Sequence, residues 1–196
     1  MIRTIALLSL LASIALGRSL LEVNTDFNSH EVSFSQLSGG NNYPTFWSAG
    51  LLLAENSDND DGMMIYGSML KTAPLTGNWI VGYGARIAWI DGKQGNRSYN
   101  GIAIPLRVKT IYRVPVKHPV RLSAEYASAP RMLTSGDIGI YDELRLEANF
   151  YIAPKMYGFI GLRQLYIGGF ETDSPAGNKD LFEFVDGGFV GFKYYF

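Results

Sequence analysis

The chain has 196 residues, the size of one domain, with 17 Lys and Arg against 18 Asp and Glu and no cysteine. Its near-neutral charge provides no basic face for nucleic acid, and the lack of cysteine excludes disulfides, thiolate zinc sites and cysteine nucleophiles. Hydrophobic residues make up 47% of the chain, yet the mean hydropathy is only +0.03, which is too low for a helical membrane protein. These values are typical of a membrane β-barrel, because only every second residue of its strands faces lipid.

The N-terminus predicts export. Arg3 supplies a positive charge, residues 5–16 are largely apolar, and Ala15-Leu16-Gly17 fits the small-x-small rule for cleavage. We therefore expect residues 1–17 to be a cleaved signal peptide and residues 18–196 to form the mature barrel domain, with cleavage after Ala15 as an alternative. An uncleaved anchor is less favoured, since a transmembrane helix needs about 20 apolar residues.

Beyond this segment, apolar and polar residues alternate with a period of two, which predicts antiparallel strands. The alternation is clearest from Trp79 to Trp89, whereas the adjacent Arg163 and Gln164 leave the faces of one later strand ambiguous. We expect an all-β, closed antiparallel transmembrane β-barrel of about ten strands. The alternative is eight strands from residue 45 onward, with the N-terminal segment tucked into or beside the barrel. The predicted strands are 20–24, 29–37, 45–54, 62–72, 78–91, 98–113, 120–127, 138–152, 156–168 and 183–196.

The predicted connections alternate in length along the chain. Outer-membrane barrels have long extracellular loops and short periplasmic turns, so this alternation favours such a barrel and places the short turns in the periplasm. The longer, more polar connections are 55–61, 92–96, 128–137 and 169–182, and the shorter ones, centred on proline, are 73–77, 114–119 and 153–155.

Trp79 and Trp89 provide a test of strand length, because they share one face and lie ten positions apart. At about 3.3 Å per residue they are separated by about 33 Å along the strand. A tilt near 40° reduces this to a height of about 25 Å, which matches the apolar band of a membrane barrel. We expect both to lie in the interfacial girdles; the alternative is a pair of core tryptophans in a soluble barrel.

The opposite faces of several strands carry full charges in mid-strand. A strand open to water on one face would also show this pattern. In a narrow barrel such side chains meet in the lumen and must pair, because an unpaired buried charge is costly. Their mixed signs favour a plugged or very narrow interior. The predicted lumen-lining residues are Arg86, Arg107, Lys109, Arg121, Glu125, Glu143, Arg145, Glu147 and Lys193.

The C-terminus carries aromatic residues at alternate positions, Phe192, Tyr194 and Phe196. A terminal aromatic residue in this context resembles the recognition signal of the outer-membrane barrel assembly machinery. The last strand must dock on a sheet edge of that machinery and later close against the first strand. We therefore expect these three residues to act as the assembly signal.

The chain also resembles the YfaZ family of outer-membrane proteins over most of its mature length. This resemblance implies the fold and the location and leaves the mechanism open. The sequence departs from the family by inserting Ser128 and by a long loop at 172–180. The similar segments are Leu21-Glu22-Val23-Asn24, residues 121–133 (RLSAEYASAPRML) followed by Ser135-Gly136-Asp137, residues 142–163 and residues 186–196.

The favoured function is a structural or narrow porin-like barrel, with internal salt bridging preferred over conduction. Its expected partners are outer-membrane lipid, lipopolysaccharide and the assembly machinery; it is expected to be a monomer without metal or cofactor. One alternative is an outer-membrane enzyme acting on lipid or peptide. Only His30 and His118 could serve as its base, and His118 lies in a turn on the predicted periplasmic side.

A further alternative is a protein that binds ligands through its surface loops. Four acidic residues, Glu55, Asp58, Asp60 and Asp61, gather in one predicted extracellular loop. Their spacing departs from that of a calcium-binding loop, so solvated surface charge is the favoured interpretation.

Overall fold

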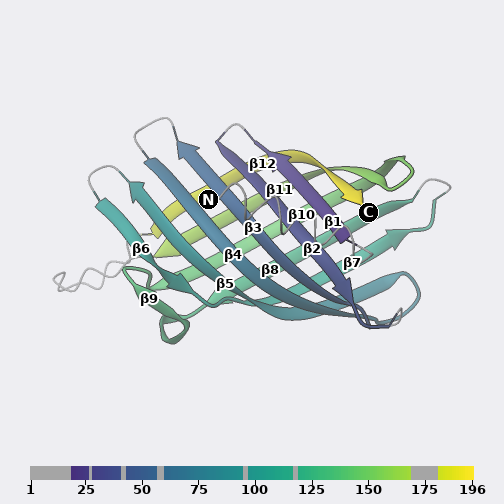
Figure 1. Ribbon diagram of the computed structural model, residues 1–196, viewed down its shortest axis with the longest axis horizontal. Coiled ribbons are helices and arrows are strands. Elements are labelled where there is room, and N and C mark those ends of the chain that lie inside the picture. Colours follow the sequence, from purple (N-terminus) through teal and green to yellow (C-terminus); the bar gives the residue numbers. More distant parts are fainter. Residues whose placement is uncertain are drawn as a thin grey trace.

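The structure, a computed structural model, describes residues 19–26, 28–40, 43–56, 60–94, 97–116, 119–168 and 181–196. Its strands form one sheet, which closes because β4 pairs with β5 as well as with β3 (Figure 1). In the part of the chain that is described, no helix is long and apolar enough to cross a membrane. The elements are β1 Ser19–Thr25, β2 Ser29–Ser38, β3 Thr45–Asn56, β4 Asp60–Pro74, β5 Trp79–Gln94, β6 Arg97–Ala103, β7 Leu106–Val114, β8 Val120–Ala129, the 3-10 turn η1 Arg131–Leu133, β9 Thr134–Gly136, β10 Ile140–Ala153, β11 Met156–Gly168 and β12 Leu181–Tyr195.

The twelve labelled strands make ten spans of the wall, because β6 with β7 and β8 with β9 are interrupted spans. β6 and β7 pair with β5 in one continuous register. The break falls at Pro105, which lacks an N–H, although its carbonyl oxygen accepts a hydrogen bond from the Arg86 backbone N–H at 3.0 Å. Pro130 and η1 separate β8 from β9 in a similar way. The prediction of ten antiparallel strands is confirmed.

The N-terminal strand β1 is part of the wall, so the eight-strand alternative is wrong. β1 pairs with β2 on one side and with β12 on the other, from Leu20 opposite Tyr195 to Thr25 opposite Val190. This seam removes the free sheet edges. A closed barrel satisfies its backbone hydrogen bonds internally, as a membrane-spanning structure must.

The predicted alternation of long and short connections is wrong for two hairpins. β3 reaches Asn56 and β4 begins at Asp60, while β5 reaches Gln94 and β6 begins at Arg97, so most of 55–61 and 92–96 is strand. Backbone hydrogen bonds between paired strands form whatever the side chains are. Polar residues therefore continue the strands in these two hairpins. The predicted loop 128–137 likewise contains the end of β8, η1 and β9. Most of 169–182 lies outside the described residues.

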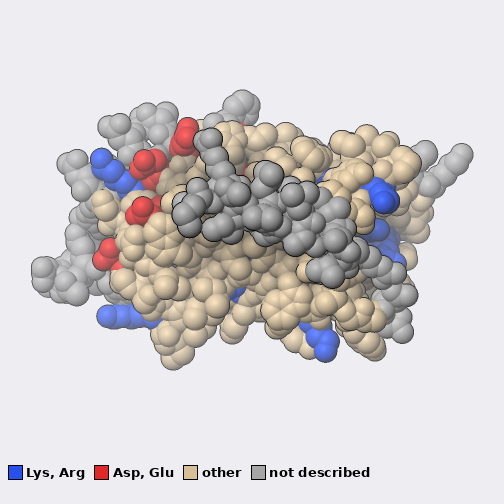
Figure 2. Space-filling view, in the orientation of Figure 1, with Lys and Arg blue, Asp and Glu red and all other residues tan. Residues whose placement is uncertain are grey.

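The outer face of the barrel is apolar across its middle. Where Figure 2 leaves this band visible, most residues are uncharged, and most of the charged side chains lie towards the two ends of the barrel. Such a large exposed apolar surface is typical of a lipid-facing wall. Exposed residues of this face include Ile65, Ile87, Leu106, Val108, Leu122, Ile160, Leu162 and Val190.

β11 resolves the strand whose faces were ambiguous. Arg163 is buried inside the barrel, whereas Gln164 faces outward, where its Nε2 donates to Asp186 Oδ1 at 3.2 Å. The register between β11 and β12 shifts beside the next residues, and Phe184 and Val185 are both buried although they are consecutive. A β-bulge allows this, because it adds one unpaired residue to one strand.

Apolar side chains fill one half of the interior. We call the end with the β1–β2, β3–β4 and β5–β6 hairpins the hairpin end and the end with Ser19 and Tyr195 the terminal end (Figure 1). A cluster of apolar side chains, called the apolar plug, fills the half of the interior at the hairpin end, and charged residues lie on its terminal side. The plug includes Leu52, Met64, Ile90, Tyr99, Ile138, Tyr141, Leu165, Ile167, Phe184 and Val185.

Candidate functional site: a buried charge network and a cavity

The nine charged side chains predicted to line the lumen all come from inward-facing strand positions. The structure brings eight of them into one connected set of ion pairs, and Arg121 stands at its edge. The eight are Arg86, Arg107, Lys109, Glu125, Glu143, Arg145, Glu147 and Lys193. The connection depends on residues that were not predicted, above all Glu31.

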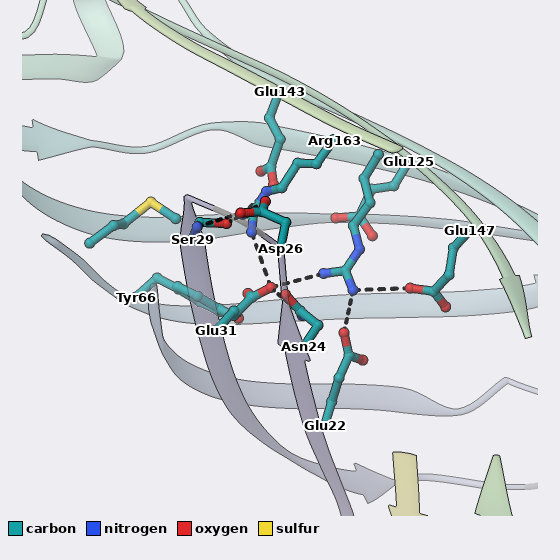
Figure 3. A network of polar contacts seen from close by, with 12 residues as sticks. Glu22, Asn24, Asp26, Ser29, Glu31, Tyr66, Glu125, Glu143, Glu147 and Arg163 are labelled. Carbon is teal, nitrogen blue, oxygen red and sulfur yellow. Dashed lines mark hydrogen bonds and ion pairs between the residues drawn. The ribbon is translucent and has the colours of Figure 1, made fainter. Parts of the chain in front are cut away.

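Glu31 on β2 is the centre of this charge network and is only 1% exposed. Its Oε2 accepts from Asn24 Nδ2 at 2.8 Å and pairs with Arg145 Nη1 at 3.2 Å and Arg163 Nη1 at 3.1 Å. The Tyr66 hydroxyl donates to Oε1 at 2.5 Å. Figure 3 shows Asn24, Tyr66 and Arg163 converging on this carboxylate. Two cations and two neutral donors thus offset the cost of burying one negative charge.

Glu143 on β10 connects the network to the apolar plug. It lies 2.5 Å from Arg86 Nη1 and 2.6 Å from Arg163 Nη2. The Tyr141 hydroxyl donates to Glu143 Oε2 at 2.7 Å and accepts from Arg86 Nη1 at 2.8 Å. The ring of Tyr141 belongs to the plug, so this residue joins the apolar and charged layers of the interior.

Glu125 on β8 organises a second cluster. Lys109 lies opposite Glu125 on the neighbouring strand β7, and its Nζ is 3.2 Å from Glu125 Oε2. Arg107 Nη2, also on β7, lies 2.5 Å from Glu125 Oε1. Arg86 Nη2 adds a longer contact of 3.8 Å. Strand pairing positions this cluster, because residues opposite each other on neighbouring strands bring their side chains together.

Arg145 on β10 extends the network to the terminal end. Its Nη2 pairs with Glu22 and with Glu147 Oε2, the latter at 3.0 Å. Lys193 also pairs with Glu147, lies 3.5 Å from Glu22 Oε2 and donates to Asn149 Oδ1 at 2.8 Å. Each of the five carboxylates of the network therefore contacts at least two cations. This arrangement favours holding the wall together over proton transfer.

Gly50 on β3 allows Tyr66 to reach Glu31. A Cβ atom at position 50 would lie 2.5 Å from Tyr66 Cζ, so only glycine lets the ring lie flat against β3. We expect Gly50→Ala to lower the free energy of unfolding by about 1–3 kcal/mol, because the ring must shift away from Glu31. Urea unfolding of the barrel in detergent micelles measures this loss. Gly67→Ala is the control, since no atom lies within 4 Å of the place that its new methyl group would take; an equal effect at both positions would contradict the expected packing.

A cavity of about 170 Å³, called the terminal cavity, lies on the terminal side of the network. Hydroxyl groups from β2, β3 and β4 form one wall. Cations from β5, β7, β8, β10 and β12 form the other, together with the carboxylates of Glu22, Glu125 and Glu147. The hydroxyl wall comprises Ser33, Ser35, Ser48, Ser68 and Thr72; the cationic wall comprises Arg86, Arg107, Lys109, Arg121, Arg145 and Lys193.

The predicted girdle and assembly residues lie on the outer face or at the terminal end. Trp79 begins β5 and is 45% exposed, with its ring centroid 4.8 Å from that of Tyr112, and Trp89 is half-buried in the second half of β5. Phe192 and Tyr194 are exposed on β12. The ring of Phe196 lies 5.0 Å from that of Tyr194. Their roles at the interface and in assembly stay predictions.

His30, the predicted base of the enzyme alternative, faces outward on β2. Its Nδ1 lies 2.7 Å from Thr25 Oγ1. The neighbouring Glu31 points to the opposite side, into the network, and Ser29 Oγ donates to Asp26 Oδ2 at 2.7 Å. Strand alternation therefore separates His30 from the two neighbours that could have worked with it.

The remaining residues of the alternative functions are only partly described. His118 and Asp58 lie outside the described residues. Glu55 and Asp61 are exposed and face each other across β3 and β4. Within the described segments, no group of three or more potential metal ligands comes together.

Glu22, Glu31 and Arg163 are the charged network members that were not predicted from the sequence. Glu22 and Glu31 lie on the inward faces of the two predicted N-terminal strands, so the period-two alternation itself could have identified them. Arg163 could not be assigned, because its polar neighbour Gln164 left both faces of the strand equally polar.

A family model described as YfaZ precursor matches residues 1–196. No curated protein matches the sequence significantly. A solved structure described as outer-membrane expressed OmpT of Vibrio cholerae shares 15% identity at a TM-score of 0.39, over 86% of this chain and 56% of that one. This chain therefore spans little more than half of that protein. A structure described as the NanC porin shares 8% identity at a TM-score of 0.45, over 92% of this chain and 98% of that one.

Proposed function

This chain belongs to the YfaZ family, and we propose that it is a small barrel of the Gram-negative outer membrane with a structural role and a closed, charged lumen. The filling of the interior carries this proposal. Leu52, Met64, Ile90, Leu165 and Ile167 of the apolar plug have no exposed surface, and beneath them the carboxylates of the network are all paired. Barrels of this size have an interior that side chains can fill.

Residues 1–17 act as a cleaved signal peptide in this proposal, and the mature chain works as a monomer without a catalytic role. Its partners are outer-membrane lipid, lipopolysaccharide and the assembly machinery that recognises Phe192, Tyr194 and Phe196. The apolar outer face supports the membrane location. Outer-membrane fractions should contain a protein with the mass of residues 18–196. Recovery of the intact chain, or of a soluble periplasmic protein, would contradict this.

Planar bilayers provide the main test. We expect the purified, refolded barrel to show no discrete conductance steps, because the plug and the paired charges leave no continuous path. A shift in gel mobility between unboiled and boiled samples should confirm that the silent protein is folded. Discrete steps from the folded protein would overturn the closed lumen.

A narrow porin-like role is the second candidate. The terminal cavity favours it, because it already occupies part of the lumen on the terminal side of the network. In that case Arg107→Glu or Glu147→Lys should change the ion selectivity of the steps, since charged side chains that line a narrow pore determine its selectivity.

A further inference from the structure

Among the residues that the structure describes, the interior of the barrel holds more positive than negative side chains. Every carboxylate of the charge network is already shared by two or more cations, so none is left to neutralise the excess. An uncompensated charge inside a narrow barrel is costly, and a bound anion would remove that cost. The cations are Arg86, Arg107, Lys109, Arg121, Arg145, Arg163 and Lys193; the carboxylates are Glu22, Glu31, Glu125, Glu143 and Glu147.

The excess positive charge lies at the terminal cavity. Arg121 forms no ion pair with any described carboxylate; its guanidinium lies 5.4 Å from the ring centroid of Tyr157. Lys109 contacts only Glu125, which Arg107 already holds, and its side chain is 21% exposed. These two residues therefore have donors available to a ligand in the cavity.

Three residues that line the cavity also carry buried polar atoms without partners. Ser68 Oγ, Arg86 Nε and Arg145 Nε are buried without a hydrogen bond to any described residue. They come from both the hydroxyl wall and the cationic wall. A molecule with several oxygen acceptors could receive hydrogen bonds from both walls at once.

The charge of the barrel ends indicates how such a molecule would enter. The described side-chain carboxylates of the terminal end are Glu22 and Glu147, and both are paired with Arg145 and Lys193. Exposed cations surround this end instead, namely Lys71, Arg113 and Lys155. In Figure 2 the acidic side chains gather at the opposite end, where β6 and β9 lie in Figure 1. A cationic entrance raises the local concentration of anions.

We propose that the terminal cavity binds a small, doubly charged oxyanion, of the phosphate type, which enters from the terminal end and is held by Arg121 and Lys109. Two charges match the excess of two cations in the interior. Arginine favours phosphate because its planar donors meet two oxygens together. The cavity volume of about 170 Å³ fits a compact molecule of this kind.

Inorganic phosphate is the probe for this site. Calorimetric titration of the refolded barrel in uncharged detergent, in mildly alkaline buffer at constant ionic strength, should show saturable binding at one site. Nitrate, which carries a single charge, should not compete. Arg121→Gln should weaken phosphate binding by roughly tenfold or more, the usual effect of losing a hydrogen bond to a charged group. Lys109→Gln should also weaken it, and Glu125 keeps Arg107 as its partner in that variant.

Lys93→Gln is the matched control, because it removes one exposed positive charge from the hairpin end. It should bind phosphate as the unaltered protein does. No saturable binding by folded protein, equal competition by nitrate, or an equal loss in Arg121→Gln and Lys93→Gln would overturn the proposal. The titration needs no bilayer, so the two proposals can fail separately. Conductance steps in a bilayer would contradict the closed lumen but not the phosphate site. Absent phosphate binding would contradict the site but not the closed lumen.

Discussion

Replacing Glu31 with alanine is expected to lower the free energy of unfolding by about 3–5 kcal/mol, the usual cost of removing one partner from a buried ion pair. The change leaves Arg145 and Arg163 without their shared carboxylate and removes the acceptor of Asn24 and Tyr66. Arg163 is only 3% exposed, so water cannot replace the lost partner. Urea unfolding in detergent micelles, followed by tryptophan fluorescence, measures the loss.

Two further variants make this result specific. Glu31→Gln keeps an acceptor for the neutral donors and removes only the charge, so its loss should be smaller. Glu55→Gln removes an exposed carboxylate at the end of β3 and should change stability by less than about 0.5 kcal/mol. If Glu31→Ala and Glu55→Gln had the same unfolding midpoint, Glu31 could not be the centre of a buried network.

An arginine at Val108 is expected to cost about 2–4 kcal/mol in a lipid bilayer. Val108 is 53% exposed on the outer face of β7 and faces Tyr83 on β5. Tyr83 lies near the middle of the segment between Trp79 and Trp89, so the new charge would enter the centre of the apolar band. The cause is the loss of hydration, because lipid offers a guanidinium group no partner.

The matched variant is Leu75→Arg, in the turn between β4 and β5, where the side chain is 65% exposed beyond the apolar band. It should cost no more than about 1 kcal/mol, the usual value near the membrane interface. Unfolding in urea from phosphatidylcholine vesicles compares the two. In a water-soluble barrel both exposed substitutions would change stability by about 0.5 kcal/mol or less. Two equally small effects would therefore contradict the lipid-facing wall.

The strands and their faces could be predicted because the information is local. Alternation between Trp79 and Trp89 specifies which side of β5 faces outward, and the same rule placed all nine predicted lumen residues on inward positions. Pairing between neighbours in the sequence is also nearly local, so ten antiparallel spans followed from ten segments. The strand ends were less predictable, as at Asn56 and Gln94, because backbone pairing continues where side-chain alternation stops.

The sequence by itself therefore determined the class of barrel, its number of strands and the inward position of its charges, since a period of two needs only nearest neighbours. Tertiary structure decided which charges meet. Glu31 contacts Arg145 and Arg163 across more than a hundred residues of chain, and only closure of the barrel brings β2 opposite β10 and β11. Closure of the barrel likewise produced the apolar plug and the terminal cavity. Whether the lumen is filled at a given level along the barrel axis depends on the side chains that all the strands contribute at that level.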